Sequence, residues 1–594
     1  MNKTMIPDFS PGVMYSISYK YVDQKNLLEK YRFNTYTEDF ETSFLYGDIN
    51  EGQMPDAVYG VKLDDVLKIG YDYDGFARQN LRTLYTGNSS ITTSYEYKSL
   101  NDGLTSCLVD TVTENGYIYS YTYDAVGNIT AYTKTNAITN EVVETYLYQY
   151  DSKNQLTYVG SDLTSGISYT YDANGNILTK TDHSTNITIT YGYTDSTWAD
   201  LLTSYNGQTI TYDAIGNPLQ YNNGTAMTFE WIFGKNLYVI NKGNLEICYA
   251  YDQKGTRTSK SYGDYYTSFH IVDDIMYGES TYGPDGSRQI YYFYDDNDVR
   301  YGFSYNGMLY YYKYNLQGDV TGIYNADGQL VVEYKYDAWG KVLSITGSLA
   351  STIGQYNPIR YRGYYYDSET GFYYISSRYY DPEIGRFINA DTTEVLSVSP
   401  MSMADKNLFA YCDNNPIVRV DIEGNVWETV FDVISLGASV VEVAVNPTDP
   451  WAWASLAGDV VDLIPFVSGV GEVTRAVKTV DKVKDTVQIA KAVDFTEDAA
   501  NIVKTLDRSS GFTKSTVSAG RKIHKGYKAT DNFLSIGKEY SKITGIRPDY
   551  IDFATKTIYE LKPMNPKSIK SGIRQLQKYN KYLGGGYLLR LELY

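Results

Sequence analysis

The chain has 594 residues, 43% of them hydrophobic, so it is too long for one ordinary core and too apolar for a disordered protein. Its 66 tyrosines against 19 phenylalanines favour half-buried β-sheet over most of its length. The net charge of −19 is uneven: residues 501–594 carry 18 Lys and Arg against 7 Asp and Glu, a net of +11, which leaves −30 for residues 1–500. Such a basic tail indicates a polyanion partner, and nucleic acid is the obvious one.

Cysteine content and hydropathy argue against a disulfide-rich, a zinc-binding and a membrane-spanning protein. Cys107, Cys248 and Cys412 are odd in number and far apart, so neither a disulfide framework nor a zinc site is predicted. The sequence contains no uninterrupted run of about 18 apolar residues, so no stable membrane span is predicted. The N-terminus lacks the pattern of a cleaved signal, so we expect either a fragment of a longer exported protein or a different export route.

A short motif recurs through residues 1–345. Tyr-Asp-Ala-x-Gly-Asn occupies 123–128, 171–176 and 212–217, with weaker copies at Tyr73, Tyr150, Tyr251 and Tyr336. Copies from Tyr150 onward are 21, 41 and 39 residues apart, which predicts a repeating unit of about twenty residues. Alternating side chains before each motif predict strands. The Asp can bond nearby backbone and the Gly tolerates positive φ, so each unit predicts a hairpin.

This pattern resembles the YD repeats of the Rhs family, in which strands wind into a large hollow β-shell. The resemblance covers roughly residues 70–425, whereas residues 1–70 contain only poor copies of the motif. It implies a mainly β shell, and it assigns the repeated Tyr and Asp residues a structural role.

Residues 346–425 contain a longer ordered pattern. It includes Ile-Arg-Tyr-Arg-Gly at 359–363, Arg-Tyr-Tyr-Asp-Pro at 378–382 and Gly-Arg-Phe-Ile-Asn-Ala-Asp at 385–391. This pattern resembles the Rhs-associated core, which plugs the shell. We therefore expect a closing module after the repeats.

The resemblance also implies self-cleavage. Relatives end the core in Asp-Pro-x-Gly-Leu and cut themselves just after it, using two aspartates as an aspartyl-protease-like pair. The matching positions here are Asp391 and Asp421. Ile422 replaces the Pro and Asn425 replaces the Leu, so a self-cleaving pair and a purely structural pair of turn residues both stay open.

Tyrosine nearly vanishes from residues 426–504, where Val and Ala dominate. The apolar pattern predicts helices over 427–445, 451–461 and 472–493. The segment resembles the pre-toxin regions of Rhs proteins, and we expect a small α-helical spacer. A role in translocation is the alternative, although Asp459 and Asp462 argue against a spanning helix.

Residues 505–594 predict an α/β domain. The order is a helix over 531–544, a strand hairpin over 547–562, a helix over 568–583 and a last strand over 587–593. Asp549 falls on the first strand, and Glu560 and Lys562 lie two apart on the second, so they share one face. Asp552, three residues from Asp549, should face away.

This order and these residues resemble the restriction-endonuclease-like PD-(D/E)XK nuclease fold. The resemblance implies a metal-dependent endonuclease that uses Mg²⁺ (or Mn²⁺), held by Asp549 and Glu560, with Glu539 as a candidate further ligand. Lys562 would orient the attacking water or stabilise charge on the phosphate. Gln575 and Tyr579 resemble the Gln-x-x-x-Tyr that often follows the signature, and the candidate catalytic set is Asp549, Glu560, Lys562, Gln575 and Tyr579.

These features together predict a secreted bacterial polymorphic toxin. A β-shell would deliver a nuclease, with DNA favoured over RNA, into the cytoplasm of a competitor cell. Its expected partners are nucleic acid, a cognate and acidic immunity protein, and components of an export machinery. The main alternative is a cell-surface adhesin or binding protein with a non-catalytic basic tail. A transferase is disfavoured because the tail has no Gly-rich phosphate loop and no nucleophile with a partner base.

Overall fold

The computed structural model describes residues 2–5, 15–22, 27–35, 38–99, 105–391, 407–421, 428–429, 550–552, 557–562 and 588–593. The chain divides into two units, Met1–Asp459 and Val460–Tyr594. Most of the predicted helical spacer therefore lies outside the described residues. No helix in the described ranges is long and apolar enough to cross a membrane.

The first unit begins with an 18-stranded sheet in which each strand pairs antiparallel with the next along the chain. One short 3-10 helix, η1 (Ile49–Glu51), interrupts it. Its strands are β1 (Asn2–Met5), β2 (Ser16–Tyr21), β3 (Leu28–Asn34), β4 (Asp39–Tyr46), β5 (Val58–Leu63), β6 (Val66–Tyr73), β7 (Gln79–Tyr85), β8 (Ser90–Ser99), β9 (Thr105–Glu114), β10 (Tyr117–Tyr123), β11 (Ile129–Asn136), β12 (Val142–Tyr150), β13 (Leu156–Gly160), β14 (Ile167–Tyr171), β15 (Ile177–Asp182), β16 (Ile187–Gly192), β17 (Ser204–Tyr205) and β18 (Gln208–Thr209).

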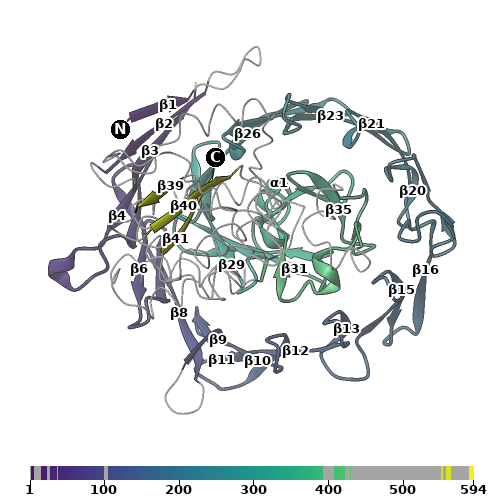
Figure 1. Cartoon of the computed structure of the whole chain (residues 1–594), viewed down its shortest axis with the longest axis horizontal. Helices are drawn as coiled ribbons and strands as arrows, with labels where there is room; N and C mark the ends of the chain where they lie inside the picture. Colours follow the sequence, from purple (N-terminus) through teal and green to yellow (C-terminus); the bar gives the residue numbers. More distant parts are fainter. Residues whose placement is uncertain are drawn as a thin grey trace. The chain divides into compact units, whose positions relative to one another are not determined.

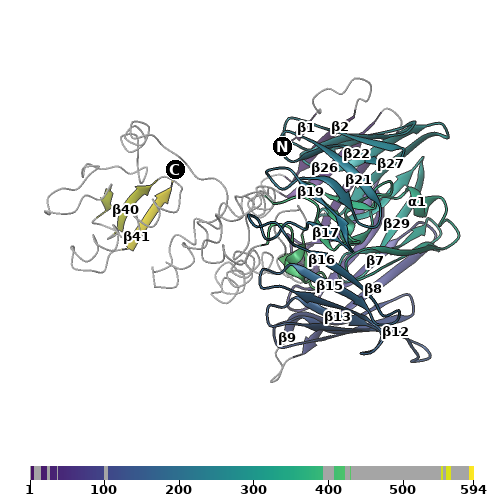
Figure 2. The same ribbon diagram turned by 90° about the vertical axis from the view of Figure 1, so that its right-hand side faces the viewer.

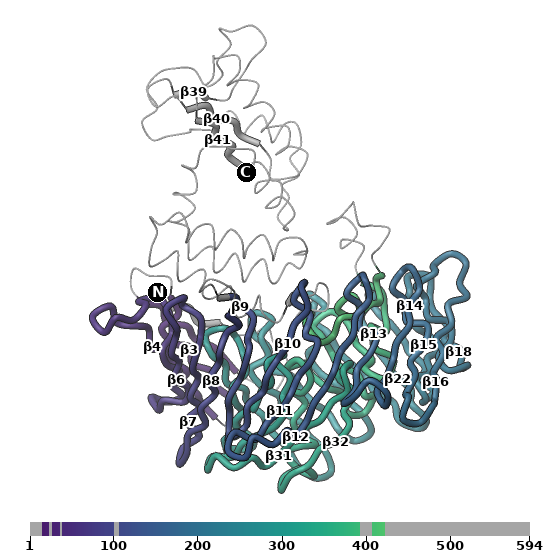
Figure 3. Tube along the Cα trace, turned by 90° about the horizontal axis from the view of Figure 1, so that it is seen from below, coloured from purple at the N-terminus to yellow at the C-terminus, as the bar shows by residue number. Residues whose placement is uncertain are grey.

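A 14-stranded sheet continues the same antiparallel meander. Figure 3 shows the up-and-down course of the hairpins from β9 to β16, with turns gathered at two rims. The strands of the second sheet are β19 (Thr211–Tyr212), β20 (Pro218–Asn222), β21 (Ala226–Ile232), β22 (Asn236–Lys242), β23 (Leu245–Tyr251), β24 (Arg257–Tyr262), β25 (Tyr265–Val272), β26 (Ile275–Gly283), β27 (Gly286–Tyr294), β28 (Arg300–Tyr305), β29 (Met308–Tyr314), β30 (Val320–Asn325), β31 (Leu330–Tyr336) and β32 (Val342–Thr346).

The two sheets of the first unit follow one another around a central region, as Figure 1 shows. The later strands of the second sheet then pack against the early strands of the first, and one buried apolar cluster joins residues from β2–β8 with residues from β25–β32. The rings of Tyr31 and Tyr277 lie 5.7 Å apart across this seam. The repeats thus bury their inner faces partly against a second layer of the same winding.

Each well-formed repeat turn is built by its aspartate. In the turn between β10 and β11, the Asp124 carboxylate accepts hydrogen bonds from the backbone N–H groups of Val126 (3.0 Å) and Asn128 (2.9 Å), and from the Asn128 side chain (2.8 Å). Gly127 adopts φ +87°, which glycine reaches without steric cost. The predicted turn chemistry is confirmed.

The tyrosine before each turn links neighbouring strands. The Tyr150 hydroxyl donates to the carbonyl of Ile129 on the preceding strand, and Tyr251 and Tyr336 do the same to Leu237 and Val320, each at 2.7 Å. At each of these tyrosines the pairing register with the following strand shifts. A phenylalanine could not make this bond, which explains the excess of tyrosine over phenylalanine.

The closing module lies inside the ring of strands, where Figure 1 places α1 and β35. Buried residues of the module and of β9–β23 form one apolar cluster. Glu428–Thr429 pair as a strand with Arg419–Val420 where a helix was predicted from residue 427, so that boundary was wrong. The elements of the module are α1 (Ile353–Tyr356), η3 (Tyr361–Gly363), β33 (Tyr365–Asp367), β34 (Phe372–Ile375), β35 (Arg378–Asp381), β36 (Arg386–Phe387), η4 (Cys412–Asn414), β37 (Arg419–Val420) and β38 (Glu428–Thr429).

The second unit contains a three-stranded sheet, drawn in yellow in Figure 2. Strand β39 (Tyr550–Asp552) pairs antiparallel with β40 (Thr557–Lys562), and β40 pairs parallel with β41 (Leu588–Leu593). The predicted hairpin and last strand are both present. A parallel return strand requires a long connection from β40 to β41, as the α/β prediction assumed.

Candidate functional site

Two of the predicted nuclease residues lie on the central strand of the second unit's sheet. Glu560 and Lys562 are residues of β40, where they pair with Leu591 and Leu593 of β41. The antiparallel partner pairs of β39 and β40 run from Asp552↔Thr557 to Tyr550↔Tyr559. The strand that carries the Glu-x-Lys signature is therefore held on both sides.

The remaining candidates of this site lie outside the described residues: Asp549, Gln575, Tyr579 and Glu539. Asp549 directly precedes β39 in the chain. Within the described ranges, no group of three or more His, Cys, Asp or Glu residues could hold a metal ion. Asp549 and Glu539 lie outside those ranges.

The two candidate self-cleavage residues meet at one arginine of the closing module. The Arg378 guanidinium lies 3.0 Å from a carboxylate oxygen of Asp391 and 3.3 Å from one of Asp421. All three side chains are buried, and the face of the Phe387 ring lies 3.5 Å from the guanidinium. Sequence reasoning missed Arg378, although its position inside the ordered motif at 378–382 was a usable signal.

Backbone contacts hold both aspartates in place. The Lys235 ammonium, directly before β22 in the chain, donates to the carbonyls of Ala390 (2.8 Å) and Asp391. The Tyr364 hydroxyl donates to the carbonyl of Asp421 (2.7 Å) and accepts from its backbone N–H (3.1 Å). Burial lowers the pKa of Lys235. The Lys235 contact thus comes from the repeat shell, and the Tyr364 contacts come from the closing module.

The polar residues of the closing motifs bind the repeat turns. Arg386 donates to the Asn176 side chain (2.9 Å), which also accepts from Asn407 (2.6 Å). Asn415 donates to the Asn128 side chain (2.8 Å). Asn128 and Asn176 are the last residues of two Tyr-Asp-Ala-x-Gly-Asn motifs. The module therefore binds the repeats at the asparagine that ends the repeated turn motif.

Comparison with known proteins agrees with both units. Residues 512–594 match the family described as Restriction endonuclease fold toxin 9. The tRNA3(Ser)-specific nuclease WapA of Bacillus spizizenii is 33% identical over 292 residues, which is 47% of this chain and 12% of that protein. The tRNA nuclease WapA of Bacillus subtilis shows the same identity and coverage. The chain therefore spans about an eighth of the length of these curated relatives.

A solved structure shares the fold of the repeats. The structure titled TcdB2-TccC3-Cdc42 superimposes with a TM-score of 0.55 at 18% identity, over 72% of this chain and 22% of that one. Residues 78–417, more than half of the chain, match the family described as Teneurin YD-shell. The protein thus belongs to the YD-shell family and carries a restriction-endonuclease-fold toxin domain at its C-terminal end.

Proposed function

We propose that this protein is a polymorphic toxin whose residues 505–594 hydrolyse the phosphodiester bonds of nucleic acid with a divalent metal ion. The observation that carries the proposal is the hairpin of β39 and β40 with Glu560 and Lys562 on the central strand. A binding module would need the basic charge of the tail but not this signature.

The strand register supports a site shared by two carboxylates. The last described pair is Tyr550↔Tyr559, and in the sequence Asp549 comes directly before Tyr550 while Glu560 comes directly after Tyr559. A continued register would set Asp549 opposite Glu560. Residues directly opposite on neighbouring strands have their Cβ atoms about 5 Å apart on one face. Asp552 pairs with Thr557 at the turn end of the hairpin, and it therefore lies away from the proposed site of Asp549 and Glu560.

This donor set fits a hard divalent cation such as Mg²⁺ or Mn²⁺, which prefers carboxylate oxygens and retains waters. When bound, the cation acidifies a water and offsets charge on the phosphate. Asp549 and Glu560 would hold it, with Glu539 as a further ligand. Lys562 would orient the water or contact the developing charge on phosphate. Gln575 and Tyr579 would contact phosphate or the metal-bound water.

The substrate is DNA or RNA. The superfamily resemblance favours DNA, whereas the WapA relatives are named as tRNA nucleases. The net charge of +11 over residues 501–594 suits either polymer, because phosphate contacts carry no base information. Both polymers therefore belong in the test.

Controlled expression in a bacterial host tests the proposal. The wild-type chain should arrest growth, while Glu560→Gln and Lys562→Ala should relieve the arrest at equal expression. Glu592→Gln, on the neighbouring strand β41, is the matched control and should stay toxic. Equal toxicity of wild type and Glu560→Gln would favour the non-catalytic binding protein.

We further propose that the protein acts outside its producer, with the shell as carrier and the tail acting in the cytoplasm of a target cell. An immunity protein with an acidic surface would protect the producer by covering the basic tail. Co-expression of such an immunity protein should restore growth and yield a complex that dissociates at high salt.

A second proposed activity is self-cleavage after the closing module. It rests on Asp391 and Asp421, which meet at Arg378, because paired carboxylates can activate a water and protonate a leaving amide. Asp421→Asn should then leave the full chain intact on a denaturing gel where the wild type gives two fragments. An intact wild-type chain would assign the pair a structural role only.

A further inference from the structure

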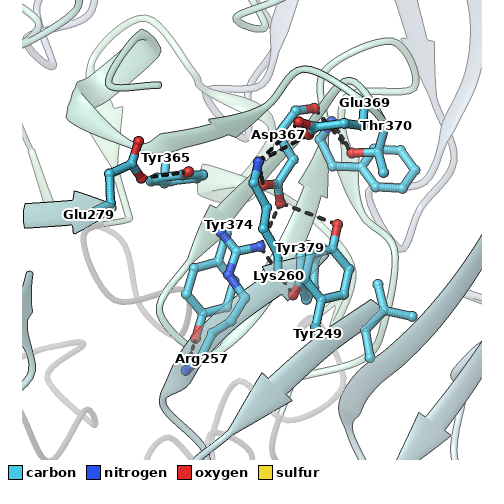
Figure 4. A network of polar contacts seen from close by, with 12 residues as sticks. Tyr249, Arg257, Lys260, Glu279, Tyr365, Asp367, Glu369, Thr370, Tyr374 and Tyr379 are labelled. Atoms are coloured by element: carbon cyan, nitrogen blue, oxygen red, sulfur yellow. Dashed lines mark hydrogen bonds and ion pairs between the residues drawn. The ribbon is translucent and has the colours of Figure 1, made fainter. Parts of the chain in front are cut away.

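A buried cluster of charged side chains joins β24 to the closing module. Arg257 donates to one carboxylate oxygen of Asp367 (2.6 Å), and Lys260 donates to the other (3.0 Å). Lys260 also pairs with Glu369 at 3.1 Å. Figure 4 shows these four side chains converging between the second sheet and β33. The side chains of all four are at most 7% exposed, so the cluster is sealed from water.

A third carboxyl group lies beside this cluster and makes no ion pair with any residue that the structure describes. Glu279 of β26 is 5% exposed, and it accepts a hydrogen bond from the Tyr365 hydroxyl of β33 at 2.8 Å. Figure 4 shows Glu279 and Tyr365 set apart from the contacts of Asp367. The two cations of the cluster thus pair with Asp367 and Glu369, and neither makes an ion pair with Glu279 in the described part of the chain.

Burying an unmatched charge is costly, and a carboxyl group avoids the cost by taking up a proton. A protonated Glu279 would also gain a donor. The hydroxyl of Tyr292, on the adjacent strand β27, is buried and has no hydrogen-bond partner among the described residues. The charge of Glu279, after burial itself, raises the pKa of Tyr292 well above its ordinary value.

We propose that Glu279 is a proton-binding site that makes the closing module adhere more strongly to the repeat shell at mildly acidic than at alkaline pH. Glu279 of the shell is buried where β26 meets β33 of the module, so the cost of burying its charge falls on this contact, and a proton on Glu279 removes that cost.

The direction of the pKa shift of Glu279 agrees with this proposal. Burial raises the pKa of Glu279 from 4.5 to about 7, opposed by Lys260, the Tyr365 hydrogen bond and Arg257, and assisted by Asp367. Because the folded pKa exceeds the unfolded one, the stabilisation is complete below pH 4.5 and is lost as the pH rises through about 7. Two further cations lie nearby: Lys242 contacts the carbonyl of Glu369, and Arg300 lies over the Tyr292 ring.

The test compares wild type and Glu279→Gln as full-length chains between pH 5 and pH 8. Denaturant unfolding is followed by tryptophan fluorescence, since Trp339 lies buried against the closing module. The two proteins should have similar midpoints at pH 5. At pH 8 the Gln variant should be more stable, by on the order of a hundredfold in the unfolding constant. A constant difference across this range would overturn the proposal.

Two further measurements check that the pH dependence comes from a proton on Glu279. Glu369→Gln, the matched control, removes an ion-paired carboxylate and should destabilise the fold at every pH tested. Infrared spectra of the wild type should show a buried carboxylic-acid band that disappears between pH 6 and pH 8. Asp381→Asn should leave that band in place. Its absence from the wild type at pH 6 would reject the proposal even if Glu279→Gln failed to fold.

Discussion

At the scale of single residues, Arg378 illustrates how one side chain determines a site. It is the cation that Asp391 and Asp421 share, and all three are buried. Sequence reasoning found the two aspartates through a family resemblance but could not find the contact. Asp391 and Asp421 are 30 positions apart, and only the folded module brings them together.

Replacing Arg378 by methionine should destabilise the protein severely. The change leaves two buried carboxylates without their cation, which costs about 3–5 kcal/mol in the free energy of unfolding. Denaturant titration measures the loss. Arg288→Met removes a partly exposed ion pair with Asp285 and should cost less than about 1 kcal/mol. Equal losses in the two variants would contradict the role given to Arg378.

His270 should make the shell sensitive to acid. Burial lowers its pKa from 6.5 to about 4. Because the folded pKa is depressed, its stabilising contribution is present above pH 6.5 and is lost as the pH falls through about 4, by about 3 kcal/mol in total. The stability of His270→Phe, measured from pH 7 to pH 4, should fall less steeply than that of the wild type. Parallel profiles would exclude this role.

At the scale of the element, the hairpin turns were predictable because their chemistry is local. The bonds of Asp124 reach only to Val126 and Asn128, so six residues of sequence contain the whole turn. The strands over residues 2–73 were less predictable. They form β1–β6 with little of the motif, because pairing with a neighbouring strand satisfies the backbone whatever the turn sequence.

Two glycines at comparable turns should respond differently to alanine. Gly127 and Gly328 have φ of +87° and +77°, so alanine strains both by about 1 kcal/mol. A Cβ at Gly127 meets open space, whereas at Gly328 it would lie 2.7 Å from the Cβ of Ser89, in the turn between β7 and β8 of the first sheet. Gly328→Ala should therefore lower the unfolding midpoint more than Gly127→Ala. The reverse order would contradict the described packing of the two sheets.

At the scale of the whole molecule, the repeated winding could not be read from the sequence. The repeat motif does not determine which strand of the first sheet packs against which strand of the second. Glu114 of β9 and Lys313 of β29, for example, form an ion pair although 199 positions separate them. For the C-terminal toxin domain, the local signature could be predicted but most of the site could not be placed. Its signature was predictable from Glu560 and Lys562, and β40 carries both, but the positions of Asp549, Gln575 and Tyr579 remain predictions.

The seam should depend on the Glu114–Lys313 pair, in which both side chains are largely buried. Lys313→Met leaves Glu114 buried, with the hydroxyls of Thr93 and Tyr324 as its hydrogen-bond donors in the described part of the chain. We expect a loss of about 3–5 kcal/mol and faster proteolysis of the shell. The double variant Lys313→Met/Glu114→Gln should recover part of that loss, and no recovery would argue against the pair.

The most direct test of the central claim is a cleavage assay. The full chain and residues 505–594, the latter checked for folding by circular dichroism, are incubated with plasmid DNA and total RNA, with Mg²⁺ or with EDTA. We predict that at least one polymer is cut, that EDTA stops the cutting, and that Glu560→Ala abolishes it while Glu592→Ala does not. A folded, metal-supplied domain that cuts neither polymer would contradict the assignment of this tail as a nuclease.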